Sequence, residues 1–179
     1  MTTGRYLVMP RGINVGTRNR VPMAELRSKL AKVGFADVAT VQQSGNVIVS
    51  TPLDRPEEVA DAMQRLLCDE FDVDVPCIVR TANQIRRVLQ RNPLQEFVTD
   101  PSRYLVNFLS KAPDSEVASA LSEKDHGPEA MAIQGSEVYI WTPDGVKAKT
   151  LSFSYLEKLF GVVVTARNWN TLEKVAAKI

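Results

Sequence analysis

Residues 5–8 read Arg-Tyr-Leu-Val, and the same four residues return at 103–106. Residues 22–30 and 113–121 form a second matching pair, with proline first and glutamate, serine and leucine at the same later positions. The chain is therefore an internal duplication, and its first copy holds seven extra residues between the two matches. These extra residues fall within the segment MPRGINVGTRNRV at 9–21.

Apolar periodicity and turn residues predict the same order of elements in both copies: strand, helix, two strands joined by a tight turn, helix, strand and a last helix. This order is typical of an α+β fold made of duplicated ferredoxin-like (split βαβ) repeats, each an antiparallel four-stranded sheet with helices plus one extra helix. We expect the first repeat at residues 1–92 and the second at 93–179. The predicted elements are 5–9, 22–34, 37–43, 46–50, 56–71, 75–79 and 81–90, then 103–109, 113–122, 130–134, 137–141, 150–160, 162–166 and 170–178.

Two of the predicted strands are apolar on both faces, at residues 6–9 and 138–141. A strand that is apolar on both sides is expected to be buried on both sides. We therefore expect the two repeats to pack as one compact unit, joined near 93–101. In the first helix, Leu26, Leu30 and Val33 are expected to form the buried stripe.

The composition is that of an ordinary globular protein of 179 residues, with 44% hydrophobic and 24% charged residues. No apolar run is long enough to span a bilayer, and the start of the chain lacks the pattern of a secretion signal. These features predict a cytoplasmic protein that makes no membrane contact, in which Cys68 and Cys77 are reduced. The sequence leaves its oligomeric state open.

The formal net charge of +1 hides an uneven distribution of charge along the chain. Residues 1–24 contain four arginines and no acidic residue, and residues 75–95 again contain four arginines and no acidic residue. Residues 54–74 contain eight acidic residues and two arginines, which we interpret as a solvated helix face. The local fields, rather than the total charge, decide what a nearby ligand experiences.

The extra segment of the first copy is the leading candidate for a binding loop. It follows a strand and leads into a helix N-terminus, where free backbone N–H groups favour an anion. Its glycines allow tight turns, and its guanidinium groups suit phosphate or carboxylate. It matches neither GxGxxG nor a Walker loop, and a solvated arginine-rich turn is the competing interpretation. The candidate ligand-binding residues of this loop are Arg11, Gly12, Asn14, Gly16, Arg18 and Arg20.

Two further stretches could add to the site. Ser44 and Asn46 lie in the turn between the second and third strands, where ordinary turn chemistry is the stronger interpretation. Near the end of the chain, Arg167 and Trp169 could hold a planar anion, although Trp169 is equally expected in the core. Asn170 with Glu173 is expected to cap the last helix. Asn168 and Lys149 complete the candidate set.

The sequence contains no recognisable metal or cofactor motif. The single histidine, His126, has no partner at metal-binding or triad spacing, and there is no HExxH motif or cysteine cluster. We therefore expect no metal and no cofactor, and hydrolysis through a triad or zinc is unsupported. Catalysis by charge and positioning stays open.

Three motifs carry a resemblance to a known family: RGINVG at 11–16, QSGNV at 43–47 and RNWNT at 167–171. In this order they resemble the bacterial family known as domain of unknown function 1697. The resemblance covers essentially the whole chain and implies a duplicated α+β fold without an established activity. The usual pattern has glycine in place of Thr17, lysines in place of Arg18 and Arg20, and serine in place of Ala148.

Three functions remain open at this stage. The first is binding of an anionic ligand, a phosphorylated small molecule or nucleotide, with nucleic acid a weaker candidate because the total charge is near zero. The second is an enzyme acting on a phosphorylated or carboxylate substrate through Arg11, Lys149 and Arg167. The third is a structural or protein-interaction module. Ferredoxin-like folds serve all three classes.

Overall fold

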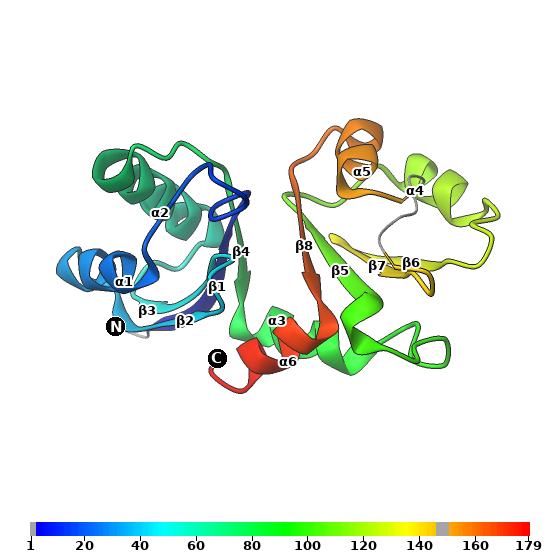
Figure 1. The fold of residues 1–179 in the computed structure, drawn as a ribbon, viewed down its shortest axis with the longest axis horizontal. Helices are drawn as coiled ribbons and strands as arrows, with labels where there is room; N and C mark the ends of the chain where they lie inside the picture. Colours follow the sequence, from blue (N-terminus) through cyan, green and yellow to red (C-terminus); the bar gives the residue numbers. More distant parts are fainter. Residues whose placement is uncertain (1–2, 146–150) are drawn as a thin grey trace. The chain divides into compact units, whose positions relative to one another are not determined.

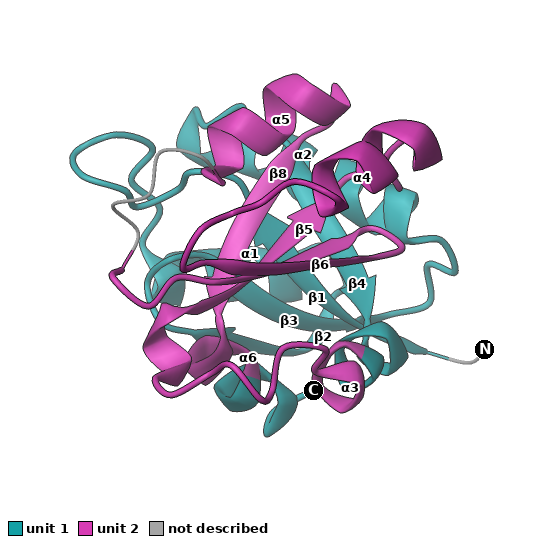
Figure 2. Ribbon diagram, turned by 90° about the vertical axis from the view of Figure 1, so that its right-hand side faces the viewer, with its two compact units in different colours: residues 1–87, 173–179 teal, residues 88–172 magenta. Residues whose placement is uncertain are grey.

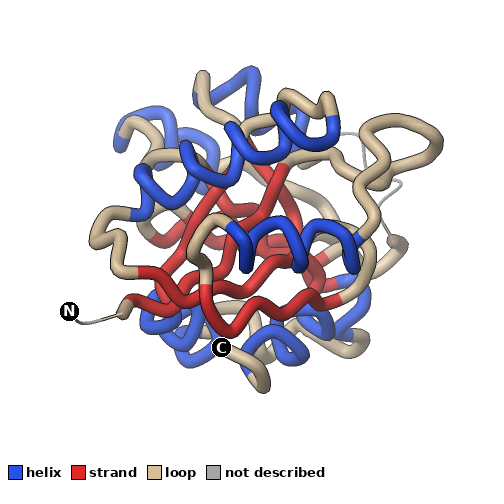
Figure 3. The backbone as a smooth tube through the Cα atoms, turned by 90° about the vertical axis from the view of Figure 1, so that its left-hand side faces the viewer, coloured by secondary structure: helices blue, strands red, loops and turns tan. Residues whose placement is uncertain are grey.

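The computed structural model describes residues 3–145 and 151–179, and its first half contains one antiparallel sheet. The strands follow the order β2-β3-β1-β4. Helices α1 and α2 lie over one face of this sheet, as Figures 1 and 3 show. The elements are β1 (Gly4–Pro10), α1 (Met23–Lys32), β2 (Ala36–Val41), β3 (Asn46–Thr51), α2 (Pro56–Phe71), β4 (Cys77–Thr81) and α3 (Ala82–Arg91).

The second half repeats this arrangement. Its antiparallel sheet has the order β6-β7-β5-β8, which is the order of the first sheet at the equivalent strands. Helices α4 and α5 lie over one face of it (Figure 1). The elements are β5 (Tyr104–Leu109), α4 (Ser115–Ser122), β6 (Ala130–Gln134), β7 (Glu137–Trp141), α5 (Phe153–Phe160), β8 (Val164–Asn168) and α6 (Trp169–Ala176). The protein is thus an α+β fold with two four-stranded antiparallel sheets and, in the part of the chain described, six α-helices.

Equivalent residues cap the last helix of each half. The backbone N–H of Gln84 donates to the Thr81 hydroxyl at the start of α3, and the Gln84 side chain accepts from the N–H of Thr81. This reciprocal pair is a capping box. At the start of α6, the Asn168 side-chain oxygen accepts from both the N–H and the hydroxyl of Thr171. The predicted cap at Asn170 is therefore wrong by two residues, because β8 continues to Asn168 and α6 begins directly after it.

Both faces of the central strands are buried, as the apolar runs predict. In β1, Tyr6 and Val8 point into a core that also contains Leu26 of α1 and Met63 of α2. The alternate residue Leu7 lies on the other face and has 0% of its surface exposed. In β7, Val138 and Ile140 belong to the core beneath α5, while Tyr139 and Trp141 are buried on the opposite face. Each such apolar side chain contributes about 1.5–3 kcal/mol relative to an exposed position.

The chain divides into two compact units (Figure 2), residues 1–87 with 173–179 and residues 88–172. The end of the chain is held to the first unit by two arginines. Arg5 donates to the carbonyl oxygen of Lys178 at 3.0 Å, and Arg86 donates to that of Ile179 at 3.4 Å. The cationic groups are placed where the helix macrodipole of α6 favours positive charge.

The last strand of each repeat lies two residues later than predicted. Strand β4 spans 77–81 rather than 75–79, and β8 spans 164–168 rather than 162–166. Pairing explains the first shift, because Cys77 is the residue opposite Pro10, the last residue of β1. Val73 and Val75 are buried in the core without belonging to the strand. Val33 is also corrected: it is the C-cap residue of α1 and is 62% exposed, so it lies outside the buried stripe.

Two further features concern chemistry and membranes. Cys68 and Cys77 are free thiols, and burial raises the pKa of Cys77 to about 12. Among the helices described, none combines the length and apolar character that crossing a bilayer would require.

Candidate functional site

Asn14 anchors the extra loop of the first unit. Its side-chain amide donates to the carbonyl oxygens of Val21 at 2.9 Å and Gln43 at 2.8 Å, and its side-chain oxygen accepts from the N–H of Val21 at 2.8 Å. Its backbone N–H donates to Asn19 at 3.0 Å. Asn14 adopts a φ of 54°, in the left-handed region where asparagine is tolerated better than most residues. The side chain thus closes the loop and also fastens it to the neighbouring turn.

The tip of the loop is a short two-stranded turn, residues 15–20, which we call the arginine turn. Val15 and Arg18 form an isolated antiparallel bridge around Gly16 and Thr17. Gly16 has a φ of 61°, which glycine adopts without strain, whereas Thr17 is absent from the residues with positive φ. The loop therefore needs a glycine at 16 but not at 17, which explains why threonine fits where the family pattern has a second glycine.

The arginines of the loop differ in their surroundings. Arg18 and Arg20 are exposed, and neither side chain makes a hydrogen bond or ion pair within residues 3–145 and 151–179. Arg11 is half-buried and follows the end of β1. Its backbone N–H donates to the carbonyl oxygen of Pro76 at 2.9 Å, and the residue has other interaction partners. The arginine turn consequently offers two guanidinium groups to solvent, and Arg11 is not equivalent to them.

The turn between β2 and β3 lies against this loop. Gly45 has a φ of 77°, and a Cβ built there would come within 2.8 Å of the Ile13 side chain. Ile13 is itself buried. Asn46 is fully buried, and its amide donates to Val41 at 2.9 Å and to the Ser44 hydroxyl at 3.3 Å. Turn chemistry accounts for Asn46, and only the exposed Ser44 among these residues faces solvent.

The third predicted stretch belongs to the second unit, where its residues have structural partners. Trp169 is 8% exposed and stacks on Tyr104 with ring centroids 4.8 Å apart and an interplanar angle of 16°. Of the two alternatives for Trp169, the structure thus gives the core. Asn168 caps α6, as described above. These two residues therefore have roles in the fold rather than in an open ligand pocket.

Arg167 is buried in strand β8. Its guanidinium donates to the Thr165 hydroxyl at 2.8 Å and to the carbonyl oxygen of Ala166 at 2.7 Å. Burial lowers the pKa of Arg167 to about 10, because the charged form is costly to desolvate. Lys149, the remaining predicted site residue, lies outside the described residues.

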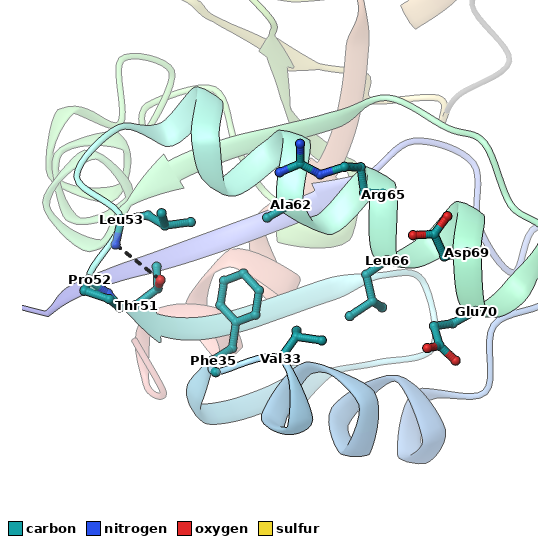
Figure 4. A pocket seen from close by; sticks show the side chains of 11 residues that line it. Val33, Phe35, Thr51, Pro52, Leu53, Ala62, Arg65, Leu66, Asp69 and Glu70 are labelled. Carbon is teal, nitrogen blue, oxygen red and sulfur yellow. Dashed lines mark hydrogen bonds between the residues drawn. The ribbon is translucent and has the colours of Figure 1, made fainter.

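The sequence did not indicate a groove that the first unit forms beside the end of α1 (Figure 4). It has a volume of about 480 Å³, and apolar side chains of Val33, Phe35, Leu53 and Leu66 line it. The charged side chains of Arg65, Asp69 and Glu70 lie along α2 at its edge, and Glu70 is paired with Lys29. The groove suits an apolar group. Val33 lines this groove and is 62% exposed, although the apolar periodicity of the sequence assigned it to the core.

In the part of the chain described, no group of three or more histidine, cysteine, aspartate or glutamate side chains is placed to hold a metal ion.

Comparison with known proteins supports the fold and places the chain in a family. No curated protein matches the chain. The solved structure of the conserved bacterial protein SP0830 from Streptococcus pneumoniae is similar, with a TM-score of 0.76 at 20% sequence identity, and the match covers 99% of each chain. At this identity the likeness concerns the fold alone. The family model described as "Protein of unknown function (DUF1697)" matches residues 3–139, and the chain belongs to that family.

Proposed function

We propose that the arginine turn binds a small anion, a phosphorylated or carboxylate-bearing molecule such as a nucleotide. One observation carries the proposal. Arg18 and Arg20 are exposed and have no partner in the part of the chain described, on a loop whose backbone is fixed by Asn14. Residues 3–24 contain no acidic side chain that could compete with a ligand. Guanidinium groups present paired N–H donors that match the oxygens of phosphate and carboxylate.

The loop geometry favours binding because little order has to be gained. A loop that is already held in one conformation loses less conformational entropy when a ligand binds. A Cβ placed at Gly12 or Gly16 would meet no other atom within 4 Å, so the backbone is open on that side. Together these features leave room for an anion to approach main-chain N–H groups beside the two arginines.

The order of the strands bears on the fold of each half. We infer that each half is a ferredoxin-like unit, which the shared orders β2-β3-β1-β4 and β6-β7-β5-β8 support. We further propose a cytoplasmic location, a reducing compartment in which Cys68 and Cys77 would stay free thiols.

A ligand titration tests the proposal. Thermal unfolding would be followed in low salt with inorganic phosphate, citrate and a nucleoside triphosphate. A ligand at a hundred times its dissociation constant stabilises the folded state by about 2.7 kcal/mol. We expect this stabilisation in the wild type and its loss in the R18A/R20A double variant. The matched control is K111A/K124A, which removes two charges from exposed positions in the second unit. Equal stabilisation of R18A/R20A and the control would contradict the proposal.

A second candidate function follows from Val15, which is 67% exposed at the tip of the same turn. An exposed apolar side chain beside two arginines also suits a protein partner that offers an apolar pocket rimmed by carboxylates. The variant Val15→Ser separates the two functions. Loss of a partner with unchanged anion binding would favour the interaction module, whereas anion binding that depends only on the arginines would favour the first proposal.

A further inference from the structure

The groove beside the end of α1 lies wholly within the first unit and shares no residue with the arginine turn. Figure 4 shows the side chains of Val33 and Phe35 pointing toward α2, where Leu66 points back toward them. Phe35 and Leu66 are each 6% exposed, whereas Val33 keeps most of its surface open to solvent. The volume of about 480 Å³ falls in the range of about 300–1,000 Å³ that is typical of small-molecule sites. These side chains therefore offer a surface to the apolar part of a small molecule.

Two charged groups of opposite sign at the edge of the groove lack partners. Arg65 and Asp69 are exposed, and neither side chain makes a hydrogen bond or ion pair with any residue that the structure describes. They are four residues apart on α2, so they lie on the same side of the helix about 6 Å apart along its axis. Glu70 also lines the groove, but it is paired with Lys29. The groove thus presents one available guanidinium and one available carboxylate beside an apolar surface.

The surroundings of the groove favour a positively charged group in the ligand. Residues 54–74, which include all of α2, contain eight acidic residues and two arginines. One of these acids, Asp61, lies four residues before Arg65 and outside the lining of the groove. The groove also lies beside the C-terminal end of α1, where the helix dipole favours a cation. An apolar anion would be repelled by Asp69 and by this field, and an apolar amine would leave Arg65 without a role.

We propose that this groove binds a zwitterionic α-amino acid with a large apolar side chain. The Arg65 guanidinium binds the carboxylate through paired N–H donors, and the Asp69 carboxylate accepts from the ammonium group. The apolar side chain of the ligand packs on Val33, Phe35 and Leu66. A segment of a protein carries no free ammonium and carboxylate on the same carbon, so it would use only the apolar part of the groove.

Four small probes test which parts of the ligand the groove recognises. They are L-phenylalanine, phenylpropionate, which lacks the ammonium group, phenylethylamine, which lacks the carboxylate, and glycine, which lacks the apolar side chain. Isothermal titration calorimetry with the full chain at low ionic strength gives the dissociation constants, because exposed charges are screened least there. An exposed charge pair changes affinity by up to about fivefold. We expect L-phenylalanine to bind about fivefold more tightly than either phenyl analogue, and glycine to show no binding.

Three variants assign each contact to a residue. R65Q should weaken L-phenylalanine and phenylpropionate about fivefold and leave phenylethylamine unchanged, because only the carboxylate loses its partner. D69N should weaken L-phenylalanine and phenylethylamine to the same extent and leave phenylpropionate no weaker. V33S removes apolar surface and should weaken all three phenyl probes equally. A loss of folding would not produce opposite preferences in R65Q and D69N, and thermal unfolding would show that each variant remains folded.

The controls separate this site from the acidic face of α2 and from the arginine turn. D61N removes an acidic charge from the same helix outside the groove, and R18A/R20A removes both arginines of the turn. Neither should change the preference for L-phenylalanine over its analogues. The proposal is overturned if L-phenylalanine does not bind at the limit of its solubility, or if either phenyl analogue binds as tightly. It is also overturned if R65Q and D69N keep the wild-type preference, or if R18A/R20A abolishes binding.

Discussion

The side-chain amide of Asn14 lies 2.8 Å from the carbonyl oxygen of Gln43 and donates a hydrogen bond to it, which joins the extra loop to the turn between β2 and β3. The same side chain makes two further bonds with Val21. We expect Asn14→Ala to lower the free energy of unfolding by about 3 kcal/mol, since three hydrogen bonds are lost and each contributes about 1 kcal/mol net. Urea unfolding measures this. The matched control is Asn19→Ala, which has a similar φ of 49° but only one longer side-chain bond, of 3.3 Å. Equal losses in the two variants would show that backbone strain, and not the bonds, matters.

The cap of α6 gives a second prediction. Asn168→Ala removes the acceptor of both the N–H and the hydroxyl of Thr171, so the first turn of the helix loses its cap. The expected loss of stability is about 1 kcal/mol. Asn170→Ala is the natural comparison, because the sequence pattern favoured position 170 as the cap. We expect this variant to unfold at nearly the wild-type urea concentration. A larger loss of stability in Asn170→Ala than in Asn168→Ala would instead support Asn170 as the cap of α6.

Trp169 gives a third prediction, because its stacking on Tyr104 makes it part of the core of the second unit. Trp169→Ala should lower the free energy of unfolding by about 3–5 kcal/mol, and Trp169→Phe by less, because a ring remains in the stack. Chemical denaturation of both variants checks the order. If Trp169→Ala were as stable as the wild type but lost affinity for an anion, the tryptophan would be a ligand contact instead.

The buried side chain of Tyr104 makes the free energy of unfolding depend on pH in the alkaline range. Burial raises the pKa of Tyr104 from 10 to about 12, because the phenolate is poorly solvated inside the protein. Between these two values the unfolded chain releases a proton that the folded chain keeps. The free energy of unfolding should therefore fall as pH rises from about 10 to about 12. Urea titrations at several pH values measure the fall, and Tyr104→Phe should make it smaller. A Tyr104→Phe variant with the full wild-type dependence would assign the effect to other groups.

Local patterns in the sequence predicted most of the elements. The bounds of α2 at 56–71 and of β6 and β7 at 130–134 and 137–141 were predicted to the residue. In α2 the apolar stripe and the proline at the first position agree, and in the hairpin Gly135 fixes the turn. These elements are determined by residues close to one another in the chain.

Strand ends and side-chain partners were less predictable because they depend on distant residues. The start of β4 is set by where β1 ends, at Pro10. The position of Trp169 depends on Tyr104, far away in the sequence. The exposed arginines of the turn could be predicted from the absence of acidic residues around them. The separate surroundings of Arg11 could not, because its burial depends on the fold.

The buried side chain of Ile13 has a consequence for the anion site that we propose at the arginine turn. The buried side chain of Ile13 and the side-chain amide of Asn14 hold the base of the loop, while residues 15–20 contribute little to the interior. Apart from Gly16, whose φ of 61° favours glycine, the tip can therefore accept new sequences without disturbing the domain beneath it. A library of variants confined to the other five positions would test whether new anion specificities arise on a constant scaffold.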